Sequence, residues 1–130
     1  MRCIKSGSDL CILGYGPILS LAWEAARHYE AKQGGSVAIY SAHTVKPLDT
    51  VGIGRLLNQF RRVVVLEEHS SVHSLGGQVK QLAWDARSGS TIGTLSLQDE
   101  FIHLYGSRDD LLRAHGITLE SLLACMSDNP

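Results

Sequence analysis

The sequence has no marked excess of charge of either sign and no long hydrophobic run. Its 12 lysines and arginines nearly balance 13 aspartates and glutamates, for a formal net charge of −1. This balance offers no electrostatic footprint for DNA, RNA or an anionic membrane surface. No apolar run approaches the roughly 18 residues of a membrane-spanning helix, and the start of the chain lacks the apolar centre of a signal peptide. We therefore expect no nucleic-acid partner and no membrane partner.

Cysteines are also few. Cys3, Cys11 and Cys125 are widely spaced and form neither a CxxC pair nor an even set. This usage is typical of reduced thiols, so we expect a cytoplasmic protein. The chain has 130 residues, of which 44% are hydrophobic. That length and composition fit one domain over residues 1–130 with a substantial core.

Short apolar runs alternate with segments of helical periodicity along the chain. Alternation of this kind predicts an α/β fold with a mostly parallel sheet and helices on both faces. The predicted strands are residues 2–5, 10–13, 37–40, 61–67 and 91–97, and the predicted helices are residues 18–32, 50–59 and 78–87, followed by two short helices separated at Gly116. We expect Gly34-Gly35 to end the first helix, and Asp49 or Thr50 to cap the second.

The most informative stretch is an apolar, β-branched run that stops at Glu67-Glu68-His69 and is followed by Gly76-Gly77. In open α/β sheets, ligands and partners meet the protein at the carboxyl ends of parallel strands. Strand alternation sends the two glutamates to opposite faces, so they cannot act as one pair. We favour a structural or interface role for them over acid–base chemistry. His43 follows the preceding strand and should lie at the same edge of the sheet.

Other candidate motifs carry less weight. Gly14-Tyr15-Gly16 resembles the start of a dinucleotide-binding fingerprint, but Leu19 stands where the third glycine belongs. We interpret it as a tight turn, with a phosphate at the following helix start near Ile18 as a further option. His69 and His73 have helical spacing in a serine-rich loop and lack a third metal ligand, so we do not favour a metal site.

Several segments together resemble the C-terminal domain of the transketolase family. Residues 9–16 with the alanine-rich helix after them resemble its first strand and helix, and His43-Thr44-Val45-Lys46-Pro47-Leu48-Asp49 resembles its T-[IV]-K-P-L-D segment. Residues 64–70 with Gly76-Gly77 resemble its E-E/D-H…G-G-x-G stretch, although Val79 replaces the last glycine. Residues 97–107 resemble its L-P-D-x-F…G-S segment, with Gln98 in place of proline, and residues 116–118 match its closing G-L-[TD] turn.

The resemblance implies a three-layer α/β/α fold with a mixed five-stranded sheet and one antiparallel edge strand, near residues 2–5. It also implies a thiamine-diphosphate-dependent, transketolase-type transferase whose cofactor and Mg²⁺ lie in partner domains. This chain would then hold no cofactor, no metal and no catalytic residue of its own. It would pack beside the cofactor's pyrimidine domain, contribute to a dimer and have an assembly role, with regulation by a small anion as an option.

The predicted contact loops are residues 41–49 and 67–74. The candidate interface or anion-site residues are Gly14, Gly16, His43, Lys46, Asp49, Glu67, Glu68, His69, Gly76 and Gly77. Exposed apolar surface at the strand ends would be the mark of a partner domain.

Three alternatives stay open. The parent enzyme could be a transketolase, a deoxyxylulose phosphate synthase or the beta subunit of a 2-oxoacid dehydrogenase. The chain could instead be a stand-alone module that binds a small anion at the strand ends. A hydrolase that uses His69 and a glutamate is the weakest alternative, because the sequence offers no matching nucleophile or metal set.

Overall fold

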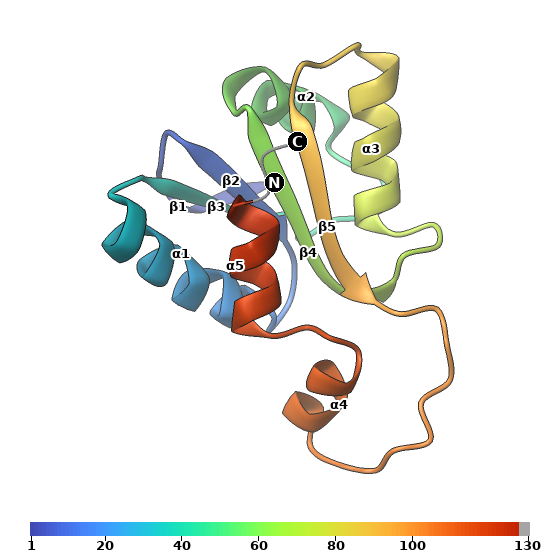
Figure 1. Ribbon diagram of the computed structural model, residues 1–130. Coiled ribbons are helices and arrows are strands. Elements are labelled where there is room, and N and C mark those ends of the chain that lie inside the picture. The colour runs from blue at the N-terminus through green and yellow to red at the C-terminus, as the bar shows by residue number, and fades with distance from the viewer. Residues whose placement is uncertain (128–130) are drawn as a thin grey trace.

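The computed structural model describes residues 1–127, which form a five-stranded sheet between two layers of helices (Figure 1). The strand order is β1-β3-β2-β4-β5, in which only the β1–β3 pair is antiparallel. The strands are β1 (Arg2–Lys5), β2 (Leu10–Gly14), β3 (Val37–Ser41), β4 (Arg62–Ser70) and β5 (Thr91–Leu97). The helices are α1 (Leu19–Gln33), α2 (Thr50–Gln59), α3 (Leu75–Asp85), α4 (Arg108–Ala114) and α5 (Leu119–Ser127). The predicted mixed sheet with an antiparallel edge strand is confirmed.

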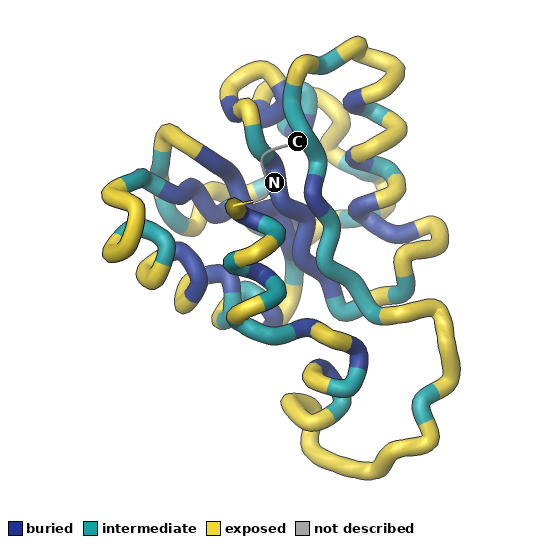
Figure 2. Tube along the Cα trace, viewed as in Figure 1, coloured by how far each residue is buried: buried dark blue, intermediate teal, exposed yellow. Residues whose placement is uncertain are grey.

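Strand alternation divides the core into two clusters, one on each face of the sheet. Along β4, Val64 and Leu66 pack with the apolar residues of α1, α4 and α5. Val63 and Val65 point to the opposite face and pack with those of α2 and α3. Figure 2 shows the buried strands between the partly exposed helices. Burial on both faces explains why β2 and β4 appear in the sequence as continuous apolar runs.

Two helix ends use the residues that the sequence predicts. Gly34 follows α1 with a φ of 69°, and its N–H donates to the Glu30 carbonyl. The left-handed conformation is the one that glycine adopts without steric penalty. Asp49 caps α2, because its carboxylate accepts the Gly52 N–H at 2.8 Å. Among residues 1–127 no helix is long and apolar enough to cross a membrane.

Two predicted boundaries are wrong, at the strand that leads to the candidate site and at the helix after it. We expected β4 to end at Glu67 and a loop to follow as far as Ser74. The strand instead continues to Ser70, where it pairs with Leu97 of β5 after an irregularity in the register. The next helix begins at Leu75, three residues before the predicted Gln78, because Ser74 caps it. Only residues 71–74 remain as a turn.

Candidate interface at the carboxyl ends of the strands

The buried carboxylate of Glu67 holds the start of α3. Alternation along β4 turns its side chain towards the α3 face, where it has no exposed surface. Its two oxygens accept the N–H groups of Leu75 and Gly76 at 3.0 and 2.9 Å. These are amides that a helix leaves without an internal partner, and a negative charge there also stabilises the helix dipole. Glu67 is therefore a structural group that fixes α3 to β4.

Ser74 and the glycine pair complete this helix start. The Ser74 hydroxyl accepts the Gly77 N–H at 3.1 Å. A Cβ on Gly76 would lie 2.8 Å from the Thr94 methyl carbon and 3.1 Å from a Glu67 oxygen, so close packing requires glycine there. Gly77 is exposed and has no such contact. Because the first amides of α3 already bind protein oxygens, an anion at Gly76-Gly77 would have to displace Glu67.

The turn at Gly14-Tyr15-Gly16 is closed in a similar way. A Cβ on Gly14 would lie 2.5 Å from the Leu66 carbonyl oxygen, and Gly16 has a φ of 75°. These two constraints support our interpretation of the motif as a tight turn. The amides of Leu19 and Ser20 donate to the carbonyls of residues 16 and 17, at 3.3 and 3.1 Å. The start of α1 therefore does not present these amides to a phosphate.

Glu68 points to the other face, as alternation predicts, and forms an ion pair with Arg108 at the start of α4. Tyr15 lies beside both glutamates. Its pKa is raised first by burial and then by the negative charges of Glu67 and Glu68. A tyrosine with a raised pKa keeps its proton and remains a hydrogen-bond donor. The sequence analysis missed Tyr15 and Arg108, because neither belongs to the motif that drew attention to the glutamates.

The remaining candidates lie at the same edge of the sheet but do not form a cluster with an evident chemical function. His43 and Lys46 are exposed in the segment between β3 and α2, and His69 is exposed near the end of β4. The Nδ1 atom of His69 lies 3.0 Å from the carbonyl oxygen of the next residue, Ser70. Asp49 is committed to its cap. Among residues 1–127, no group of three or more His, Cys, Asp or Glu side chains could hold a metal ion.

The most distinctive feature of this edge is exposed apolar surface. Phe101, Leu104 and Tyr105 are 95%, 61% and 104% exposed on the long segment that follows β5. Val72, in the turn after β4, is 47% exposed, and Val51, in the first turn of α2, is 66% exposed. We refer to these five residues as the strand-end apolar set. Figure 2 shows the segment after β5 as a mostly exposed loop that extends from the sheet.

Both ends of that loop are anchored. At its start, the Gln98 N–H donates to Nδ1 of the buried His115 at 3.1 Å. At its end, Ser107 and Asp110 form a reciprocal capping box at the start of α4. The hydrogen bonds to Ser107 are the main reason why the pKa of Asp110 is lowered. The loop thus presents its apolar side chains from fixed ends.

The fold and this edge define an α/β domain with exposed apolar side chains at the carboxyl ends of its strands. The chain matches the family model described as "Transketolase, C-terminal domain" over residues 1–122. It is 34% identical over 116 residues to the 1-deoxy-D-xylulose-5-phosphate synthase of Chlorobium phaeovibrioides. That match covers 89% of this chain and 18% of the synthase. The synthase of Bacteroides fragilis is 30% identical over 128 residues, covering 98% of this chain and 20% of its own length.

A solved structure described as "Split gene transketolase, inactive beta4 tetramer" matches with a TM-score of 0.85 and 25% identity. The match covers 95% of this chain and 40% of that one. The chain belongs to the family of transketolase C-terminal domains. It spans about a fifth of the length of the curated relatives that it matches.

Proposed function

We propose that this chain is the assembly domain of a thiamine-diphosphate-dependent carbon–carbon transferase. On this proposal it docks through the strand-end apolar set onto the domain that binds the pyrimidine ring of the cofactor. The observation that carries the proposal is the nearly complete exposure of Phe101 and Tyr105 on a loop whose two ends are anchored. Exposed aromatic side chains of this kind are typical of interaction surfaces.

Thiamine diphosphate and Mg²⁺ are held by the partner domains in this proposal. A diphosphate–Mg²⁺ site needs oxygen ligands for the metal and free amides or cations for the phosphates. The described residues offer no suitable group of metal ligands, and the amides at the starts of α1 and α3 have protein partners. These residues do not fit the cofactor, so we assign no step of the reaction to them.

The relatives favour two-carbon transfer as the reaction of the whole enzyme. The curated relatives cited above are named 1-deoxy-D-xylulose-5-phosphate synthases, and the solved structure is named a transketolase. We propose the same class for the enzyme to which this domain contributes, acting as a dimer. The wide spacing of Cys3, Cys11 and Cys125, with no CxxC pair among them, supports a cytoplasmic setting. Glu67 and Glu68 then stabilise the docking surface indirectly, because they hold the starts of α3 and α4 in place.

Co-expression with a transketolase-type chain from the same genome that carries the cofactor-binding domains tests the proposal. We expect a stable complex with sugar-transferring activity. The double variant Phe101→Ser/Tyr105→Ser should raise the Kd at least about thirtyfold, because aromatic hot spots dominate interface energies. Trp23→Ser is the matched control, since Trp23 is an exposed aromatic residue on α1, outside this surface.

Two results would overturn the proposal. One is the absence of any complex at concentrations where both chains are folded. The other is a complex with unchanged affinity when Phe101 and Tyr105 are both serine. Because these side chains are exposed, their replacement should not unfold the domain, and circular dichroism of the variant checks that it is folded. If the chain is continuous with the cofactor-binding domains, the same variants are made in the longer chain, and dimer stability is measured.

A further inference from the structure

The two outermost strands of the sheet, β1 and β5, differ in how well they are protected against pairing with another strand. Strand β1 has four residues, carries Arg2 and Lys5, and has an irregular register between Cys3 and Lys5. Short length, charge and irregularity are the usual protections of an edge strand. Strand β5 has seven residues, Thr91–Leu97, with no charge and no proline. Its register with β4 is regular from Thr91 to Leu95 and shifts only before Leu97, so most of the strand lacks these protections.

The outward side of β5 offers a row of backbone donors and acceptors. The Thr91 N–H donates to the Arg61 carbonyl at 2.8 Å, so residue 91 faces β4. Because alternate residues of a strand direct their backbone groups to opposite sides, Ile92, Thr94 and Ser96 face away from β4. The described part of the chain supplies no partner for the backbone groups of these three residues. They offer three N–H and three C=O groups to an added strand.

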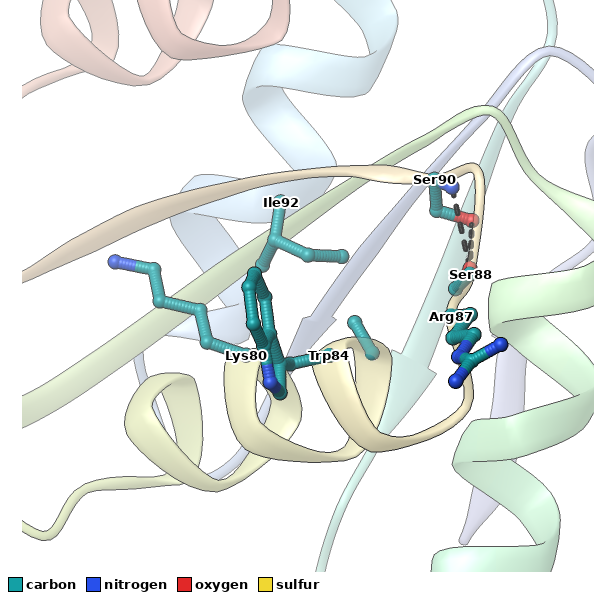
Figure 3. A pocket seen from close by; sticks show the side chains of 7 residues that line it. Lys80, Trp84, Arg87, Ser88, Ser90 and Ile92 are labelled. Atoms are coloured by element: carbon teal, nitrogen blue, oxygen red, sulfur yellow. Dashed lines mark hydrogen bonds between the residues drawn. The ribbon is translucent and has the colours of Figure 1, made fainter.

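A groove of about 660 Å³ runs beside this edge, between α3 and β5. Trp84 of α3 lines it and is 82% exposed. Figure 3 shows the Trp84 ring beside Ile92, with Lys80 and Arg87 on either side. The Lys80 ammonium lies 3.1 Å from the Thr94 hydroxyl. An added strand would place the side chains opposite Ile92 and Thr94 over this groove, next to Trp84 and Lys80.

The positive charge of the groove indicates which kind of strand could pair with β5. Lys80 and Arg87 line the groove, and no acidic residue does. Antiparallel pairing of two copies with the most backbone bonds would place Thr94 opposite Thr94, and the two Lys80 ammonium groups would then meet. Each Lys80 ammonium lies 3.1 Å from its own Thr94 hydroxyl, so the two like charges would repel each other at close range and disfavour this pairing. A segment with a carboxylate at that position would instead pair with Lys80.

We propose that β5 binds an extended segment of a partner protein as an added strand. The segment carries an acidic residue opposite Thr94 and a large apolar residue two positions away, opposite Ile92 and against Trp84. Backbone bonds supply most of the affinity in this mode of recognition, and the groove supplies the specificity. This surface is separate from the strand-end apolar set, so the proposal does not rest on the proposed assembly function.

Selection from a phage-displayed library of random linear peptides against the full chain tests this inference. We expect enrichment of sequences with an acidic residue two positions from a large apolar one. The selected peptide should shift the amide resonances of Ile92, Thr94 and Ser96. Trp84→Ala should weaken binding about tenfold, since aromatic anchors dominate such contacts, whereas Trp23→Ala should not. Lys80→Glu should change the selected charge from acidic to basic.

Thr94→Pro gives a second test, directed at the backbone. Its N–H points outward, so proline removes no bond to β4 but blocks the added strand. Binding should be abolished in this variant. The exposed Lys80 and Trp84 variants keep the inference falsifiable if the proline variant does not fold. Four results would each overturn the proposal. The first two are selection of basic peptides and no enrichment of any sequence. The other two are unchanged binding in both exposed variants, and self-association of the chain that Thr94→Pro removes.

Discussion

Replacing Glu67 by glutamine is the sharpest test of the role assigned to the buried carboxylate. Glutamine keeps the size of the side chain but can accept only one of the two amides, and its NH₂ group faces the other. The carboxylate accepts N–H groups from Leu75 and Gly76 at 3.0 and 2.9 Å in a fully buried position. Each hydrogen bond to a charged group contributes about 1.5–3 kcal/mol. Loss of one bond and of the charge at the helix start should cost about 3 kcal/mol.

Chemical denaturation measures this cost as a change in the unfolding midpoint at constant m-value. Hydrogen exchange should show faster opening at the Leu75 and Gly76 amides. Glu68→Gln is the matched control, because Glu68 is partly exposed and a surface ion pair contributes at most about 1 kcal/mol. A Glu67→Gln variant within about 1 kcal/mol of the wild type, with unchanged exchange at these two amides, would refute the structural role.

Three further predictions concern other described residues. Gly76→Ala should destabilise the domain by about 2 kcal/mol, because the new Cβ would lie 2.8 Å from a neighbouring methyl carbon, whereas Gly77→Ala should be neutral or stabilising in the same denaturation assay. The pKa of Asp49 is lowered, mainly by the helix amide that donates to it, so its stabilising effect is present at neutral pH and is lost as the pH falls through that lowered pKa. Asp49→Ala should therefore lower the Tm at pH 7, and the difference from the wild type should shrink below about pH 4. Burial raises the pKa of the Cys11 thiol, so iodoacetamide should alkylate the exposed Cys3 in the folded chain and leave Cys11 unmodified; equal labelling by mass spectrometry would contradict this.

Much of the fold could be predicted from the sequence because its signals are local. The run Leu10–Leu13 is apolar at every position, which is the pattern of a strand buried on both faces, and β2 lies where that run predicts. Gly34 and Asp49 act at helix ends through their own backbone and side-chain preferences. The antiparallel direction of β1 came from the family resemblance, because the residues of a four-residue strand do not specify its direction.

The boundaries around Glu67 could not be predicted in this way, because they depend on contacts between distant segments. Glu68, His69 and Ser70 have no apolar character, and they extend β4 only through pairing as far as Leu97. Gly76 and Gly77 disfavour a helix by their intrinsic propensity. The early start of α3 is stabilised by the hydroxyl of Ser74 and the carboxylate of Glu67, and the latter is eight residues from the amide it binds.

Local signals in the sequence also pointed to different residues at the carboxyl ends of the strands from those that the folded chain exposes there. Glu67, Glu68 and the glycine pair drew attention because polar residues end an apolar run, yet in the fold they mainly hold α3 and α4 in place. The residues with most surface to offer, Phe101 and Tyr105, lie in a segment without hydrophobic periodicity. Their exposure is evident only in the folded structure, in which contacts at both ends fix the segment in place. Mutations at Glu67 should therefore act through stability, whereas mutations at Phe101 and Tyr105 should act through association. Measuring both quantities for each variant separates the structural support of this edge from the surface that it presents.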